Sequence, residues 1–87
     1  MNLVIVFGKI VSNVEFKFIY NRYSSRELKD KTSIATCRIE LLNKSIVKVY
    51  GYDKIADYMY RKLKVNDNML IEGKLDSLGN IEIICLN

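Results

Sequence analysis

The residues best suited to chemistry in this chain are Lys48, Tyr50 and Tyr52, which alternate along the segment Ile46–Tyr52. Alternate residues of a β-strand share a face, so this strand would carry a cation beside two aromatic rings. Rings of this kind stack on unpaired bases, and a neighbouring cation neutralises the phosphates between them. The segment therefore predicts a single-stranded nucleic acid as ligand. The alternative is that both tyrosines only pack within a closed sheet.

Further cations are expected on the same surface. Arg38 faces outward from the alternating segment Thr32–Leu42, and strand pairing would place it beside Lys48. Lys9 and Lys74, in other strand-like segments, could contact additional phosphates. Cations spread over one sheet surface would hold the nucleic-acid backbone, while the rings hold the bases.

The polar segment 21–31, NRYSSRELKDK, is expected to be a loop between two strands. It interleaves cations with Tyr23, so it is either a solvated loop or one flank of the binding cleft. Before it, Phe16, Phe18 and Tyr20 alternate; Phe16 is expected to pack, and the other two either bind or pack. The predicted nucleic-acid-binding residues are Lys9, Phe18, Tyr20, Arg22, Tyr23, Arg26, Arg38, Lys48, Tyr50, Tyr52 and Lys74.

The sequence offers no recognisable catalytic or metal-binding motif. It has no histidine, and its two cysteines, Cys37 and Cys85, are far apart, which excludes a zinc site of the usual type. Both are expected to be buried free thiols, with a disulfide as the alternative if their strands adjoin. Glu40, Glu72 and Glu82 match no acid–base motif. We therefore expect neither an enzyme nor a cofactor nor a metal.

Length and charge limit the remaining choices. The 87 residues correspond to one domain, residues 1–87, and the net charge of +4 favours an anionic partner. No apolar run approaches the roughly 18 residues of a membrane span, and the start of the chain lacks the features of a signal peptide. The bias toward Lys, Asn, Ile and Tyr is typical of an AT-rich coding sequence. We therefore expect a cytoplasmic protein, or an organelle-encoded one of the plastid stroma or nucleoid.

Short strands and one helix must position these residues. The first of the five strands is expected over Leu3–Val11 and to continue over Val14–Tyr20 after a turn or bulge at Ser12–Asn13. The other elements are expected to be strands at Thr32–Leu42, Ile46–Tyr52, Met69–Leu75 and Ile81–Leu86, and a helix at Lys54–Lys64 that Asp53 can cap. The predicted fold class is all-β with one short helix: a five-stranded OB-fold Greek-key barrel, with the helix between strands 3 and 4.

The first strand and two later residues carry further information. Leu3, Ile5 and Phe7 form one apolar face of a strand whose other face is also apolar, so this set is expected in a self-complementary subunit interface, with contact to the ligand as the alternative. Gly73, inside a strand, predicts a bulge or a close backbone approach. Asn66, in the turn before that strand, is suited to a positive φ.

Taken together, these motifs resemble the OB domain of single-stranded DNA-binding proteins (SSBs), most closely the short plastid and cyanobacterial members. The resemblance covers almost the whole chain and includes Gly8-Lys9-Ile10 at the end of the first strand. Tyr52 to Asp57 matches the pattern aromatic, two residues, aliphatic, Ala, acid. Leu70 to Leu75, LIEGKL, matches the aliphatic-Glu-Gly-basic-Leu strand, which is specific only in combination with the other motifs.

The resemblance implies a function and an assembly. It places Tyr52 at a base-stacking position, Lys48 at a phosphate-contacting one, and the first strand in the interface of a homodimer or homotetramer. This chain departs from the bacterial members because it has no tryptophan, and Ile46 stands where one such tryptophan would be. Its loops are short, and it ends at Asn87 without an acidic tip, so recruitment of replication proteins through a tail is not expected.

The expected function is therefore binding of single-stranded DNA with little sequence preference, in DNA replication, repair or recombination. Two alternatives remain open at this point. An OB-fold adaptor could bind protein through its apolar strand faces, serving oligomerisation or a primosome-like assembly. An RNA-binding OB protein would use the same rings and cations, because every base has a face on which a ring can stack.

Overall fold

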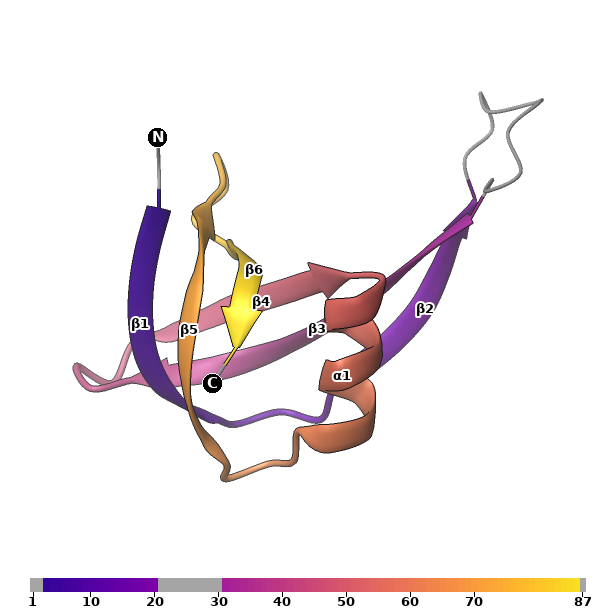
Figure 1. The fold of residues 1–87 in the computed structure, drawn as a ribbon. Helices are drawn as coiled ribbons and strands as arrows, with labels where there is room; N and C mark the ends of the chain where they lie inside the picture. The colour runs from indigo at the N-terminus through magenta and orange to yellow at the C-terminus, as the bar shows by residue number, and fades with distance from the viewer. Residues whose placement is uncertain (1–2, 21–30, 87) are drawn as a thin grey trace.

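The computed structural model describes residues 3–20 and 31–86, which form an antiparallel-rich sheet that curls around a core, with a single helix beside it (Figure 1). Apolar residues at every second position form its strands, as the sequence predicts. The elements are β1 (Leu3–Ile10), β2 (Glu15–Tyr20), β3 (Lys31–Leu41), β4 (Ile46–Tyr52), α1 (Lys54–Lys62), β5 (Asn68–Leu75) and β6 (Ile81–Leu86).

Five of these strands close into a ring. The sheet order is β1-β5-β6-β4-β3-β2, and β1 also pairs with β3, which joins the two sides. In sequence order α1 lies between the third and fourth strands of this ring, so the predicted OB fold is confirmed. The prediction of one strand over Leu3–Tyr20 is only partly right, because the chain bends at Ser12 and divides into two strands. β2 pairs with β3 beyond the ring, where it is the edge strand.

The core is built from alternate residues of the ring strands together with one face of α1. Fully buried side chains include Ile10, Ile39, Val49, Met59 and Ile71. Their neighbours in sequence point outward, which is why each ring strand has one apolar and one exposed face. On β1 the outward set is Leu3, Ile5 and Phe7, with 47%, 70% and 47% of their surfaces exposed.

Helix α1 is shorter than predicted. It ends at Lys62, because Leu63 is already extended and the Lys64 N–H donates to the Asp67 carboxylate (2.9 Å). Asp53 occupies the N-cap position, but its side chain makes no capping hydrogen bond. Gly51 lets the helix approach β4, since a Cβ there would collide with Ile55. No helix in the described ranges is long and apolar enough to cross a membrane.

Two predicted backbone features are confirmed. Asn66 has a φ of 81°. At Gly73 a Cβ would collide with the Glu82 carbonyl oxygen, and the β5–β6 register shifts by one residue beside it. Glu72 faces Cys85 while Gly73 faces Ile83, so Ile84 is the extra residue of a β-bulge.

The prediction that both cysteines are buried is wrong for Cys85, and the bulge is the reason. Cys37 is buried in the core, where desolvation raises the pKa of its thiol to about 11. Cys85 is exposed, because the extra residue moves it to the outer face beside Glu72. Both thiols are free, and β3 does not pair with β6.

Candidate nucleic-acid interface

The register between β3 and β4 assembles the central part of the predicted site. Arg38 lies directly opposite Lys48, as expected from the sequence. Two residues further along, Thr36 faces Tyr50, and then Ile34 faces Tyr52. Paired residues point to the same side of a sheet, so cations and rings share one surface. We call this side of β2, β3 and β4 the front face. Its residues are Glu15, Lys17, Ile34, Thr36, Arg38, Lys48, Tyr50 and Tyr52.

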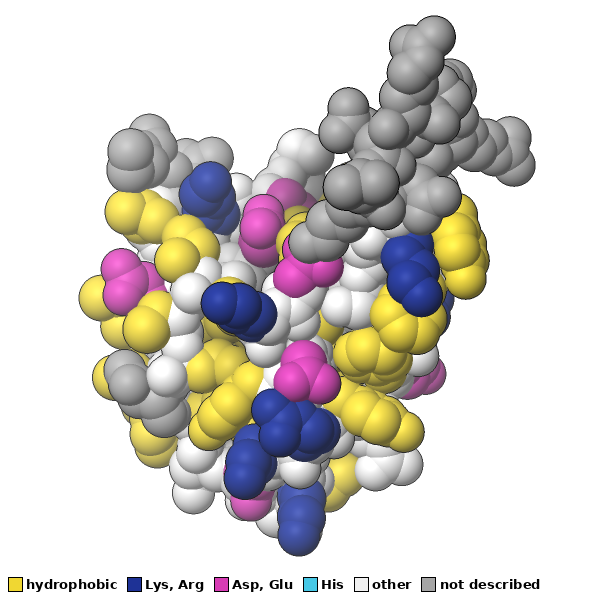
Figure 2. All heavy atoms as spheres, turned by 45° about the vertical axis from the view of Figure 1, so that its right-hand side comes forward, with side chains coloured by type: hydrophobic (Ala, Val, Ile, Leu, Met, Phe, Trp, Pro, Cys, Tyr) yellow, Lys and Arg dark blue, Asp and Glu magenta, His cyan; other side chains and the backbone are white. Residues whose placement is uncertain are grey.

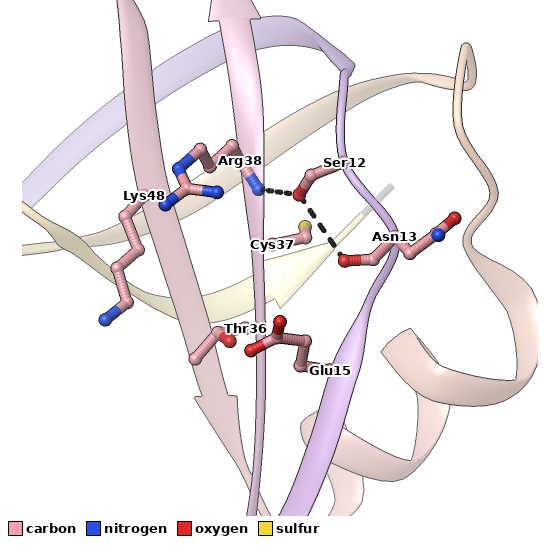
Figure 3. Close-up of a pocket in the computed structure, with 7 residues that line it drawn as sticks. All are labelled: Ser12, Asn13, Glu15, Thr36, Cys37, Arg38 and Lys48. Atoms are coloured by element: carbon pink, nitrogen blue, oxygen red, sulfur yellow. Dashed lines mark hydrogen bonds between the residues drawn. The ribbon is translucent and has the colours of Figure 1, made fainter.

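The link between β1 and β2 holds Arg38 in place. The Arg38 N–H donates to the Ser12 hydroxyl oxygen (2.8 Å), and the Val11 N–H donates to the Arg38 carbonyl (2.9 Å). A cavity of about 300 Å³ lies beside this contact (Figure 3). It is lined by Ser12, Asn13, Glu15, Thr36, Cys37, Arg38 and Lys48.

A second depression continues the first along the front face. Its volume is about 320 Å³, and Glu15, Thr36 and Lys48 line both. It adds Lys17, which pairs with Ile34 and so lies on the same surface as Tyr52. Lys17 was absent from the predicted site because only the β2–β3 register reveals which side of β2 faces Lys48. Together the two depressions form a shallow groove across three strands.

Within the described part of the chain, Arg38 and Lys48 make no ion pair. Like charges directly opposite each other on a sheet are destabilising. Both residues are exposed, and the Arg38 side chain reaches toward Lys48 on β4 (Figure 3). A phosphate placed between them would relieve the repulsion, so the pair favours an anionic ligand.

Tyr50 is anchored rather than free. Its hydroxyl donates to a carboxylate oxygen of Asp76 (2.8 Å), while the other oxygen of Asp76 accepts the N–H groups of Leu78 and Asn80. Burial, and next this hydrogen bond, raise the pKa of Tyr50 to about 12. One carboxylate thus joins β4 to the β5–β6 turn. The sequence shows no signal for this contact, because 26 residues separate the two partners.

Tyr52 presents its ring with more freedom. Its exposed fraction is 38%, and its ring meets that of Tyr50 edge to face, with centroids 5.8 Å apart. Tyr50 therefore orients Tyr52, and Asp76 orients Tyr50. Of these two rings, Tyr52 is therefore the more accessible to a ligand.

We expect the contact between Tyr50 and Asp76 to make stability depend on pH. The hydrogen bond lowers the pKa of Asp76, so its stabilisation is present above the unfolded carboxyl pKa of about 4 and is lost as pH falls further. The raised pKa of Tyr50 matters at high pH, because the stabilisation that it gives is lost as the pH rises from about 10 through 12. Urea unfolding should show Asp76→Asn less stable than wild type near pH 7, with the difference shrinking below about pH 4. A difference independent of pH would contradict this role for the carboxylate.

The remaining predicted binding residues lie in several places. Lys9 is exposed and pairs with Glu40, one strand away from Arg38. Lys74 pairs with Glu82, which in turn faces Tyr50, so it reaches the other border of the front face. The structure does not bring Phe18 and Tyr20 together with these residues, because they point to the opposite side of β2. Arg22, Tyr23 and Arg26 lie outside the described residues.

No protein-family model and no curated protein sequence matches this chain. Among solved structures, the SSB domain of a Synechococcus sp. protein is similar with a TM-score of 0.79 at 17% identity, over 100% of this chain and 94% of that one. The single-stranded DNA-binding protein of Thermus aquaticus gives 0.77 at 16% identity, over 100% of this chain and 39% of that one. A small single-stranded DNA-binding protein from Streptomyces coelicolor gives 0.65 at 12%, over 100% and 93%. The chain therefore shares its fold with single-stranded DNA-binding domains, and the resemblance indicated by its motifs is confirmed at the level of the fold.

Proposed function

We propose that this protein binds single-stranded DNA on its front face with little sequence preference, in DNA replication, repair or recombination. The observation that carries the proposal is the Arg38–Lys48 pair beside Tyr50 and Tyr52. The solved structures that share the fold are named as single-stranded DNA-binding proteins, which supports the same ligand here.

The geometry suggests how the strand would lie. Phosphates would contact Arg38 and Lys48 toward one end of the groove and Lys17 toward the edge strand, on either side of the Glu15 carboxylate that lines both depressions. A base would stack on the exposed ring of Tyr52, whose orientation is maintained by its contact with Tyr50. None of these contacts reads the hydrogen-bonding edge of a base, so the binding would depend little on sequence.

Salt dependence tests the cationic part of the site. The affinity for oligo-dT should fall linearly on a log–log plot as salt rises, with a slope of about −0.7 per neutralised phosphate. Lys48→Ala should weaken binding at low salt and make the slope shallower by about 0.7, because one phosphate contact is lost. Lys62→Ala, which removes an exposed cation from α1, is the matched control. Absence of binding at low salt would leave the protein-adaptor alternative, and preference for oligo-rU over oligo-dT of equal length would favour RNA.

We further propose a homodimer or homotetramer assembled through the outer face of β1. Leu3, Ile5 and Phe7 are exposed side by side, and the register places Leu70 of β5 directly opposite Phe7. An exposed apolar surface of this kind is typical of an interaction site. Light scattering should give a multiple of the monomer mass for wild type and the monomer mass for Ile5→Asp. A monomeric wild type would contradict the proposal.

A further inference from the structure

The reverse side of β2 carries a second group of aromatic residues that the front face does not use. Phe16, Phe18 and Tyr20 alternate with Lys17 and Ile19, so they point away from the front face. Phe18 and Tyr20 are exposed to 49% and 68%. Figure 2 brings forward the side of the molecule on which β2 lies and shows hydrophobic side chains on the surface among Lys, Arg, Asp and Glu side chains.

These rings are held by a chain of contacts that begins on α1. Tyr60 packs against Phe16 with ring centroids 5.0 Å apart. Phe16 in turn meets Phe18 edge to face at 5.4 Å. Phe18 is therefore oriented before any ligand arrives, which reduces the entropy lost on binding. Tyr20 is two residues after Phe18 and lies about 7 Å further along β2. This distance is about twice the 3.4 Å spacing of stacked bases.

The charge on this surface fits a phosphate backbone. The Lys31 ammonium lies 4.6 Å from the centre of the Phe18 ring, and Lys31 is the cross-strand neighbour of Tyr20. The described residues of β2 and β3 that alternate onto the reverse side are Phe16, Phe18, Tyr20, Lys31, Ser33, Ala35, Cys37, Ile39 and Leu41, and none of them is acidic. An apolar protein partner would have to bury the Lys31 charge, whereas a phosphate would neutralise it.

Two acidic residues at or near α1 limit the extent of this surface. Asp57 is bound by Arg61 of the same helix (2.8 Å), so its charge is compensated. Asp53 adjoins the surface where its backbone N–H donates to the Ser33 carbonyl. A nucleic-acid strand would therefore follow β2 and Lys31 and stay away from the start of α1.

The reverse side is continuous with the front face. β2 is the edge strand of the sheet, and it carries Lys17 on its front side and Phe18 and Tyr20 on its reverse side. A ligand can therefore reach both sides by passing around this one strand. Resting on the proposed function, we propose that single-stranded DNA leaving the front face passes around β2 and stacks its next bases on Phe18 and Tyr20, with a phosphate at Lys31. The front face would then hold short strands alone, and the reverse side would add affinity only for longer ones.

The test compares two lengths of fluorescein-labelled oligo-dT, about 5 and about 20 nucleotides, because one OB fold covers about 4–16 nucleotides. Tyr20→Ala should leave the short-strand Kd unchanged and weaken the long-strand Kd about tenfold, the usual effect of removing one base stack. Tyr58→Ala is the matched control. Tyr58 is an exposed tyrosine on the flank of α1 opposite to Tyr60, away from the reverse side of β2, so its removal should change neither Kd. Phe18→Leu, which keeps the apolar packing, should have the same length-dependent effect as Tyr20→Ala.

Each other result overturns the proposal. Equal long-strand affinity for wild type, Tyr20→Ala and Phe18→Leu would remove the reverse side from the binding path. A lower oligomer mass for Tyr20→Ala, with long-strand affinity unchanged, would assign the rings to contact between copies. If wild type binds the short strand but Tyr20→Ala has no effect on either length, only this inference fails. If wild type binds neither length, the proposed function fails with it.

Discussion

Tyr52→Ala is expected to weaken the binding of a short oligo-dT about tenfold to a hundredfold while leaving the domain folded. Removal of an aromatic ring from a stacked base costs about 1–3 kcal/mol of binding free energy. The cost to folding is smaller, about 1 kcal/mol, because the residue is 38% exposed and its ring meets that of Tyr50 edge to face. Fluorescence anisotropy at low salt measures the first effect, and thermal unfolding measures the second.

Tyr52→Phe and Tyr58→Ala are the controls for this result. Tyr52→Phe keeps the ring and should retain most of the affinity, since stacking needs the face of the ring and not its hydroxyl. Tyr58→Ala removes a similarly exposed ring from α1 and should not affect the short strand. If Tyr52→Ala unfolds the domain and Lys48→Ala leaves the affinity unchanged, the front face is packed and is not the binding surface.

Gly73→Ala is expected to destabilise the domain by about 3 kcal/mol, at the upper end of the range for overpacking. The added methyl group would collide with the backbone carbonyl of Glu82 and with the Ile81 side chain, and a backbone atom cannot rotate away. A domain of this size has only about 4–13 kcal/mol of stability in total. The melting temperature should therefore fall by more than about 10 °C. Urea unfolding monitored by circular dichroism gives the free energy directly.

Gly79→Ala separates this collision from the ordinary cost of losing a glycine. Gly79 has a φ of 84° and no atom within 4 Å of an added Cβ, so the substitution should cost only about 1–2 kcal/mol of backbone strain. Gly79→Asn should cost less, since asparagine tolerates this conformation, as Asn66 does in this chain. Equal losses for Gly73→Ala and Gly79→Ala would show that the approach of β5 to β6 does not depend on the missing side chain.

The alternation of residue types determined which side chains of a strand share a face, without reference to the tertiary structure. It placed Lys48, Tyr50 and Tyr52 on one outer face, and Leu3, Ile5 and Phe7 on another, because side chains of a strand alternate regardless of its partners. The backbone preferences of glycine and asparagine also marked Gly73 and Asn66 as positions with special backbone geometry. These are local properties, which depend only on neighbours along the chain.

The tertiary structure decided what depends on pairing between distant segments. The β2–β3 register put Lys17 on the front face and Phe18 and Tyr20 behind it, although the alternation alone allowed either side to bind. The bulge at Ile84 moved Cys85 outward, and the turn before β6 placed Asp76 within reach of Tyr50. A shift of one residue in register reverses the face of every later side chain, and no local pattern encodes such a shift. The sequence alone therefore determined which side chains of one strand share a face, and the register between strands decided which of these faces form one surface.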